Sequence, residues 1–269
     1  MKVLHLWNTA GVGSIIAKFV DKAYGTEGTV MTRRKFDQVG FTTYGKAYDD
    51  GATRFFVRAM LAARKADLVH VTSWDRAVPW LKRLYPGKPV ALYYVGTDIL
   101  GRWGEKHPRW KKADAVAYST SNLASGAPQD AIHIPAPIDT EFFSRRDVVR
   151  NQGTALSRHY GMDAEAEGIA KDRGLRLEWI GKLGVPHADL PELFSSFEYY
   201  IDLRRPEGHQ EPVHSVGKAA LEALACGCKV IPWSGEVIST LPDENRPETV
   251  AATWHALYER LLTGSKATK

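Results

Sequence analysis

The chain is poor in cysteine and contains no long apolar run. Its 269 residues include only two cysteines, Cys226 and Cys228. A disulfide across that spacing would close a very small, strained loop, and two thiols make a poor zinc site, so we interpret both as small buried residues. No stretch approaches 18 consecutive apolar residues, which excludes a membrane-spanning helix. The N-terminus also lacks the apolar segment of a secretory signal, and we expect a cytoplasmic protein.

Composition and charge describe a globular protein with an uneven charge distribution. Hydrophobic residues make up 44% and charged residues 25% of the chain, and the length suits two domains. Residues 1–143 hold 20 Lys and Arg against 13 Asp and Glu, whereas the remainder holds 16 against 18. The basic half therefore predicts an anionic partner, either a nucleic acid or an acidic membrane surface. Ordinary solvating charge is the alternative.

Short apolar strands alternate with amphipathic helices along the whole chain. This alternation predicts parallel sheets covered on both faces, in doubly wound α/β domains. The Pro-punctuated segment 135–139 marks the domain boundary. We predict an N-terminal Rossmann-like domain over 1–140, a second over 141–246, and a C-terminal helix with a frayed tail over 247–269. Two such domains facing across a cleft would bind ligands at the carboxyl ends of their strands.

The segment Ser215–Pro232, SVGKAALEALACGCKVIP, predicts a short helix followed by a buried strand. Ser215 is a candidate N-cap, and Gly227 is a candidate left-handed stop after the last turn. Lys218 and Glu222 lie four residues apart, on one face of the helix. A helix N-terminus with a lysine attracts an anion, and a carboxylate one turn later accepts hydrogen bonds from hydroxyl groups. A sugar nucleotide carries both kinds of group, although a surface ion pair would use the same spacing.

Six segments together resemble a known enzyme family. The chain resembles the nucleotide-sugar-dependent glycosyltransferases of the GT-B fold, specifically the family-4 (group 1) retaining enzymes and their short archaeal-type members. The resemblance covers almost the whole chain and implies a C-terminal helix that crosses back to the first domain. Its segments are, in order, KVLHLWNTAGVGS, DLVHVTSWD, PVALYYVGTDI, KKADAVAYST, IPAPIDTEFF and HSVGKAALEALACGCKVI.

The resemblance implies a donor site built mainly from the second domain. Glu222 matches the family's ribose-binding glutamate, and His214 stands where a second glutamate usually contacts the donor sugar. Arg158 is the nearest match to the basic residues that grip the diphosphate, and Lys218 substitutes for their missing lysine partner. The remaining donor-binding candidates are Ser215 and Gly217 at the helix start and the Gly11, Gly13 and Ser14 backbone of the first domain. A tight strand-to-helix turn is the alternative for the latter.

The resemblance also implies the reaction chemistry. Cleavage of a sugar–diphosphate bond develops negative charge on the leaving phosphate, which cations and N–H groups stabilise. Retaining enzymes of this fold are thought to use front-face attack, in which that phosphate helps to deprotonate the acceptor. We expect a nucleoside-diphosphate sugar as co-substrate, with no metal and no other cofactor. Asp98, His214 and Lys218 are the catalytic candidates, and a helix cap is the alternative for Asp98.

The segment Gly101–Asp114 interleaves basic residues with tryptophans. With Thr97 it supplies the acceptor-side candidates Trp103, Arg109 and Trp110. Such a mixture binds nucleic acid through phosphates and stacking, or lies at a glycolipid or membrane interface. A solvated helix whose tryptophans pack inward is the alternative.

Three further functions remain open. A phage-type DNA glycosyltransferase, acting on a modified base, would explain the basic first domain. A catalytically weakened sugar-nucleotide-binding subunit would explain His214, and Val95 where the family often has histidine. A sugar-nucleotide epimerase of the same fold is a minor alternative.

The loop GHQEPVHS holds His209, Glu211 and His214, but its spacing fits no usual zinc motif.

Overall fold

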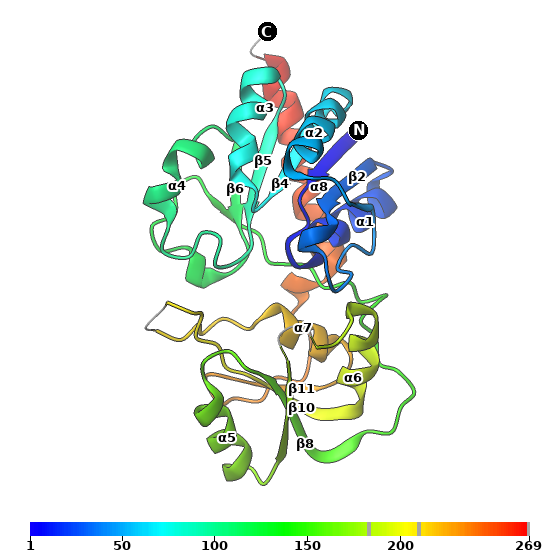
Figure 1. The fold of residues 1–269 in the computed structure, drawn as a ribbon, viewed down its shortest axis with the longest axis vertical. Helices are drawn as coiled ribbons and strands as arrows, with labels where there is room; N and C mark the ends of the chain where they lie inside the picture. Colours follow the sequence, from blue (N-terminus) through cyan, green and yellow to red (C-terminus); the bar gives the residue numbers. More distant parts are fainter. Residues whose placement is uncertain (182–183, 209–210, 268–269) are drawn as a thin grey trace. The chain divides into compact units, whose positions relative to one another are not determined.

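The chain forms two compact α/β units. The computed structural model describes residues 1–181, 184–208 and 211–267, with side chains as far as Gly264. Unit 1 contains Met1–Pro137 together with Pro247–Lys269, and unit 2 contains Ile138–Arg246 (Figure 1). Each is described below by itself. His209 of the GHQEPVHS loop lies outside the described residues.

Unit 1 is built on a seven-stranded sheet in which every neighbouring pair of strands is parallel. The strand order is β3-β2-β1-β4-β5-β6-β7. All five side chains of β4 and all five of β5 are buried, as expected for strands with both faces covered. The strand bounds are β1 Lys2–Leu6, β2 Glu27–Arg33, β3 Lys46–Tyr48, β4 Leu68–Thr72, β5 Val90–Tyr94, β6 Ala115–Tyr118 and β7 Ile132–His133.

Helices cover both faces of this sheet. One core contains apolar residues of α2 (Ala52–Lys65), α3 (Val78–Leu84) and α4 (Trp103–Trp110). The other contains residues of α1 (Val12–Tyr24) and α8 (Pro247–Ala267). The prediction of a doubly wound Rossmann-like domain is confirmed for this unit.

The C-terminal helix α8 belongs to unit 1, although unit 2 separates it from the rest in sequence. Trp254 is fully buried, with its ring centroid 4.2 Å from that of His70 in β4. The hydroxyl of Tyr258 shares a 2.6 Å hydrogen bond with Nδ1 of the same histidine. Burial lowers the pKa of His70 well below its usual value and that of the neighbouring His5 to about 4. Both imidazoles are therefore neutral groups of the core at pH 7.

Unit 2 is a second, smaller Rossmann-like unit. Its four strands are parallel, in the order β11-β10-β8-β9, with bounds β8 Asn151–Arg158, β9 Arg176–Ile180, β10 Phe197–Asp202 and β11 Lys229–Pro232. Its helices are α5 (Asp163–Asp172), α6 (Leu190–Ser196) and α7 (Lys218–Ala225). Cys226 and Cys228 are free and buried, which confirms their predicted role, and burial raises both thiol pKa values to about 12.

One local prediction is wrong, and one strand was not predicted. The predicted N-cap at Ser215 is wrong, because α7 begins at Lys218 with Gly217 as its N-cap. The edge strand β3 was not predicted, since its three residues carry too little pattern to stand out. The left-handed stop at Gly227 is confirmed, with φ of 83°.

Within the described residues, no helix combines the length and the apolar character needed to cross a bilayer.

Candidate functional sites in the two units

The donor-site candidates of unit 2 gather at the carboxyl edge of its parallel sheet. Arg158 is the last residue of β8, Asp202 the last of β10, and α7 follows β10 after a loop. Ligands of open α/β sheets bind outside this edge of the strands. The sheet therefore brings Arg158 and the start of α7 to the same edge.

Lys218 and Glu222 form an ion pair at the start of α7. The Glu222 carboxylate is 4% exposed, and the Lys218 ammonium lies 5.8 Å from the ring centre of Phe143. Burial, assisted by the charge of Lys218, lowers the pKa of the nearby His187 to about 4. The two charges are thus partly desolvated, unlike those of an exposed surface pair.

The start of α7 is anchored by a carboxylate at the end of β10. The N–H of Gly217 donates to Asp202 Oδ2 over 2.6 Å, and Asp202 Oδ1 lies 3.1 Å from Nε of Arg204. Arg204 in turn donates to the carbonyl oxygen of Ser215. A Cβ at Gly217 would lie 2.9 Å from the Arg204 guanidinium, so glycine leaves room for this ion pair. These bonds hold Ser215 and Gly217 by their backbones.

His214 is exposed and lies edge-on to Trp233, with ring centroids 5.6 Å apart. Trp233 directly follows β11, so both residues lie near the carboxyl edge of the sheet. An exposed imidazole beside an indole face suits contact with a sugar, whose hydroxyls need donors and acceptors and whose C–H face packs on aromatic rings.

In unit 1, the turn that contains Gly11, Gly13 and Ser14 is covered by the chain itself. The Ser14 N–H donates to Oδ1 of Asn8 over 2.9 Å, and its hydroxyl donates to the carbonyl of Tyr44 over 2.7 Å. A Cβ at Gly11 would lie 3.1 Å from the carbonyl oxygen of Phe41. Ser14 is fully buried, so in this conformation the turn is a junction between strand, helix and loop.

Asp98 organises the loop after β5. Its carboxylate accepts the N–H of Gly96 over 2.7 Å and that of Val95 over 3.3 Å, whereas Thr97 is exposed. Burial raises the pKa of Asp98, an effect opposed by the neighbouring Ser73 hydroxyl, these two N–H groups and the charge of Lys106. A carboxyl group with a raised pKa is a better proton acceptor than an ordinary aspartate.

The segment around α4 divides into core and cavity positions. Trp103 is buried and donates its indole N–H to the carbonyl of Leu123, while Trp110 donates to the carbonyl of Trp103. Both tryptophans pack inward. Arg109 points the other way, and its guanidinium lies 3.5 Å from the buried carboxylate of Asp75.

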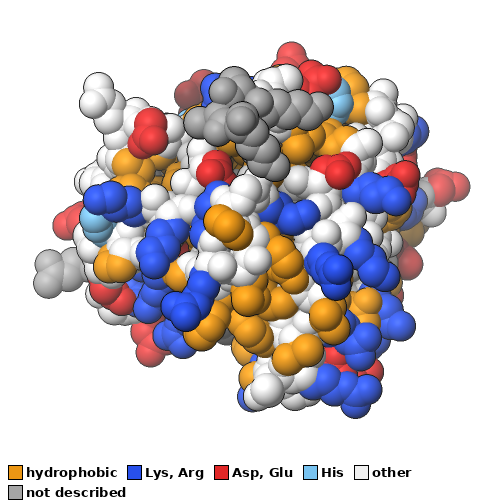
Figure 2. Space-filling view, turned by 90° about the horizontal axis from the view of Figure 1, so that it is seen from above, with side chains coloured by type: hydrophobic (Ala, Val, Ile, Leu, Met, Phe, Trp, Pro, Cys, Tyr) orange, Lys and Arg blue, Asp and Glu red, His pale blue; other side chains and the backbone are white. Residues whose placement is uncertain are grey.

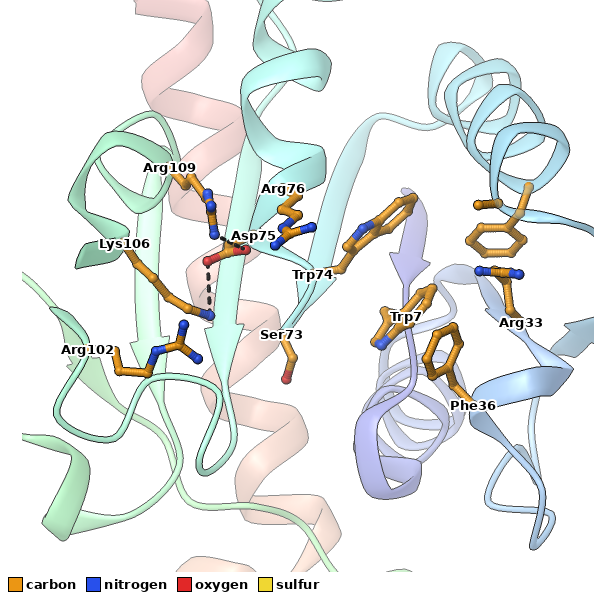
Figure 3. A pocket seen from close by; sticks show the side chains of 12 residues that line it. Trp7, Arg33, Phe36, Ser73, Trp74, Asp75, Arg76, Arg102, Lys106 and Arg109 are labelled. Atoms are coloured by element: carbon orange, nitrogen blue, oxygen red, sulfur yellow. Dashed lines mark ion pairs between the residues drawn. The ribbon is translucent and has the colours of Figure 1, made fainter. Parts of the chain in front are cut away.

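A cavity of about 410 Å³ opens in unit 1 (Figure 3). Its polar side chains include five cations and one carboxylate, and its apolar ones include four aromatic rings. The lining residues are Trp7, Arg33, Phe36, Ala52, Phe55, Ser73, Trp74, Asp75, Arg76, Arg102, Lys106 and Arg109. This basic cavity, as we call it, has the size and mixed lining of a small-molecule site.

The basic cavity lies at the switch point of the sheet. β1 and β4 are neighbours, and the chain proceeds outward from them in opposite directions, so the loops after these strands diverge. Trp7 follows β1, and Ser73 follows β4; these two non-glycine residues have positive φ values of 71° and 62°. Strained backbone of this kind is concentrated at functional sites.

The sequence missed most of this cavity. Only Arg109 was among the predicted site residues, because the lining comes from segments far apart in sequence. A signal was nevertheless present: Trp7 ends a predicted strand, and Arg33 and Ser73 each directly follow one. Polar and aromatic residues at such positions converge at one edge of a parallel sheet.

Comparison with solved structures finds the same fold in sugar-nucleotide proteins. The Staphylococcus aureus MnaA–UDP co-structure aligns with a TM-score of 0.50 and 13% identity, over 97% of this chain and 89% of that one. UDP-GlcNAc 2-epimerase from Neisseria meningitidis, bound to UDP-GlcNAc, aligns with a TM-score of 0.50 and 12% identity, over 98% and 94%. The Rickettsia bellii UDP-N-acetylglucosamine 2-epimerase gives 0.50 and 11%, over 98% and 97%.

At these identities the similarity establishes the fold. The chain has the GT-B type of fold, with two Rossmann-like units. No protein-family model and no curated protein sequence matches it.

Proposed function

We propose that this protein transfers a hexose-type sugar, with retention, from a nucleoside-diphosphate sugar to an acceptor. The observation that carries the proposal is the carboxyl edge of unit 2, where Arg158, Lys218 and Glu222 accompany a helix N-terminus. The family-4 resemblance supports transfer and retention. The fold supports a sugar nucleotide, because the solved structures that share it include complexes with UDP and with UDP-GlcNAc.

The donor residues have separate roles in this proposal. Lys218 and Arg158 bind the diphosphate and stabilise the charge that develops on it as the sugar leaves. Glu222 accepts hydrogen bonds from the ribose, and the Ser215 and Gly217 backbone lies beside the phosphates. His214 contacts the donor sugar. In the structure Lys218 and Glu222 hold each other, so donor binding gives each a second partner.

Acceptor activation is assigned to the loop after β5 in unit 1. Asp98 contacts the acceptor hydroxyl as a carboxylate of raised pKa, and the leaving phosphate shares the removal of the proton. Thr97 and Arg109 lie on the acceptor side. The excess of basic residues in this part of the chain favours an anionic acceptor or surface.

The first test is calorimetric titration with UDP-glucose, UDP-GlcNAc and GDP-mannose. Removal of one charge alone would leave its partner buried, so the informative variant is the double change Lys218→Met with Glu222→Gln. We expect it to weaken binding of the preferred donor by at least about 30-fold, since charge-assisted bonds to phosphate and to ribose are both lost. The matched control is Lys229→Met with Glu198→Gln, which removes the ion pair between the first strand residue of β11 and Glu198 of β10. Equal weakening in both would argue against a donor site at α7.

The second test separates transfer from the alternatives. Release of nucleoside diphosphate that depends on an added acceptor supports the proposal. Conversion of the donor to an epimer without that release would indicate an epimerase instead. Tight donor binding without turnover, across a panel of acceptors, would indicate a binding subunit.

A further inference from the structure

We propose that the basic cavity of unit 1 binds a phosphate group of the acceptor and packs the adjoining ring of that acceptor against aromatic side chains. The word acceptor rests on the proposed transferase function. Phosphate binding by the cavity does not rest on that function, because it can be measured without any donor sugar.

Two cations of the cavity have no carboxylate partner among the described residues. Arg33 donates from Nε to the backbone carbonyl of Asp50 over 3.1 Å, and its guanidinium lies 5.3 Å from the ring centre of Phe36. Arg76 is exposed on the segment that follows β4. Neither charge is neutralised by an ion pair, so both attract an anion that enters the cavity.

Two further cations share one carboxylate. Asp75 is 3% exposed and lies 3.1 Å from the Lys106 ammonium and 3.5 Å from the Arg109 guanidinium. It also accepts a 3.2 Å hydrogen bond from the hydroxyl of Tyr94. The single buried carboxylate thus fixes two cations in place and leaves one positive charge in excess. Arg102 contributes none, since it pairs in bidentate fashion with Glu105.

Four of the five cations lie on one side of the cavity, and Arg33 lies on the other side, next to Phe36. Figure 3 shows Arg76, Arg102, Lys106 and Arg109 around Asp75, and Trp7 and Phe36 across from them, with Trp74 between. The ring centroids of Trp7 and Trp74 are 5.2 Å apart, and those of Trp7 and Phe36 are 4.8 Å apart. Phe36 is 54% exposed, which leaves apolar surface for a ligand. The arrangement fits a ligand with a doubly charged end and a ring.

The cavity favours a compact ligand over a polymer. Its volume of about 410 Å³ is in the range of small-molecule sites. Proteins that bind single-stranded nucleic acid instead use a basic groove with rings spaced for successive bases. Here the aromatic rings pack on one another in one cluster, as a wall for a single group.

The phosphate has two chemical sources, a soluble phosphomonoester or a lipid headgroup. The outer face formed by α2 and α3 carries four large apolar side chains that are 50–60% exposed, namely Val57, Leu61, Trp80 and Leu84. Figure 2 shows hydrophobic side chains gathered on one face, with Lys and Arg on both sides of them. Such a surface suits an anionic bilayer, so the test includes both sources.

The test measures binding of phenyl phosphate to the full chain by calorimetry, without donor sugar. The variant is Arg33→Gln with Arg76→Gln, and the matched control is Lys65→Gln with Arg83→Gln, two exposed cations of α2 and α3 that do not line the cavity. We expect the first pair to weaken binding at least about tenfold, the control to change it less than twofold, and benzoate to bind more weakly than phenyl phosphate. Equal effects of the two pairs, or equal affinity for benzoate, would overturn the proposal.

Vesicles and an oligonucleotide distinguish the sources. If phosphatidic acid in phosphatidylcholine vesicles binds, and Arg33→Gln with Arg76→Gln releases the protein from it, the source is a lipid headgroup. In that case Leu61→Ser with Trp80→Ser also weakens vesicle binding but leaves phenyl phosphate binding intact. Absence of binding to both phenyl phosphate and these vesicles overturns the proposal. Tighter binding of a single-stranded oligonucleotide than of either, lost in the arginine variant, would overturn it in favour of nucleic acid.

Because no donor is present, failure of this test leaves the donor titration untouched. Failure of the donor titration likewise leaves phosphate binding in unit 1 to be measured. The two hypotheses therefore fail separately.

Discussion

The two units share one architecture and carry opposite charge. Each is a parallel sheet with helices on its faces, yet unit 1 holds 23 Lys and Arg against 13 Asp and Glu, and unit 2 holds 13 against 18. In unit 1, five of the basic residues line a cavity whose lining includes a single carboxylate. In unit 2, two of the cations near the sheet edge face a carboxylate: Lys218 faces Glu222, and Arg204 faces Asp202.

This difference is the basis for proposing two kinds of anion site. Balanced charges in unit 2 suit a ligand with both phosphate and hydroxyl groups, because the carboxylates accept what the cations cannot. The unbalanced positive charge in unit 1 suits a ligand whose charged end is anionic and carries no hydroxyl groups that need a carboxylate acceptor. The same fold thus presents different chemistry at equivalent edges, as expected when function is carried by the site and not by the fold.

The largest expected effect is the loss of catalytic rate caused by a single substitution in unit 1. We predict that Asp98→Asn lowers kcat at least about 100-fold, in the range for loss of a proton acceptor, while donor affinity in unit 2 changes less than twofold. Because burial raises the pKa of Asp98, the wild-type rate should fall with decreasing pH at a higher pH than an ordinary aspartate would give, and this limb should vanish in the variant. Steady-state kinetics with calorimetric donor titration measures both quantities.

The control for this prediction is Asp130→Asn, an exposed aspartate of the same unit. It should leave kcat unchanged. A less than tenfold loss in Asp98→Asn would mean that the leaving phosphate removes the acceptor proton without help from Asp98.

The second expected effect is on stability, and it tests whether unit 1 depends on its C-terminal helix. Trp254 is fully buried between α8 and the sheet, so Trp254→Ala should lower the free energy of unfolding by about 3–5 kcal/mol. Hydrogen exchange followed by mass spectrometry should show the loss in peptides of β1, β4 and β5. Trp80→Ala, at a half-exposed position on α3, is the matched control and should cost less than about 1 kcal/mol.

Equal loss of protection in β8 and β10 would contradict the division into two units. Preserved protection there would show that unit 2 is stabilised by its own core.

The sequence was sufficient where the signal is local. The α7–β11 segment places a helix, a left-handed glycine and a buried strand within 18 residues, and its helix, stop and strand were predicted. Ser215 failed as the N-cap because Asp202, distant in sequence, binds the Gly217 N–H instead. The basic cavity was missed for the same reason. Its lining comes from the ends of separate strands and from α4, and the strand order that joins them is not encoded at any one position.

The third prediction concerns buried histidines, one in each unit, and the pH dependence of stability that they cause. Burial lowers the pKa of His5 in unit 1 and of His187 in unit 2 from 6.5 to about 4. The unfolded chain therefore binds more protons than the folded one between these pH values, and stability falls as pH decreases from about 6.5 to about 4. The loss due to His5 is on the order of 3 kcal/mol. Chemical unfolding at pH 7.0 and 4.5 should show a smaller pH dependence in His5→Gln than in the wild type.

His133→Gln, at an exposed histidine, is the control and should keep the wild-type pH dependence. An unaltered pH dependence in His5→Gln would mean that His5 is not the group whose protonation destabilises unit 1.

The smallest expected effect concerns the two cysteines of unit 2. Burial raises their pKa values to about 12, so neither thiol forms an appreciable thiolate at pH 8. The Cys228 thiol also donates to the carbonyl of Phe194, 2.7 Å away. Alkylation of the folded protein should therefore be slow and limited by opening of unit 2, and Cys226→Ala should cost only about 1 kcal/mol because one sulfur atom is removed from the core. Mass spectrometry of iodoacetamide-treated protein measures the rate. Labelling as fast as in the unfolded chain would show that the core of unit 2 opens readily, and only unit 1 would then have a rigid site.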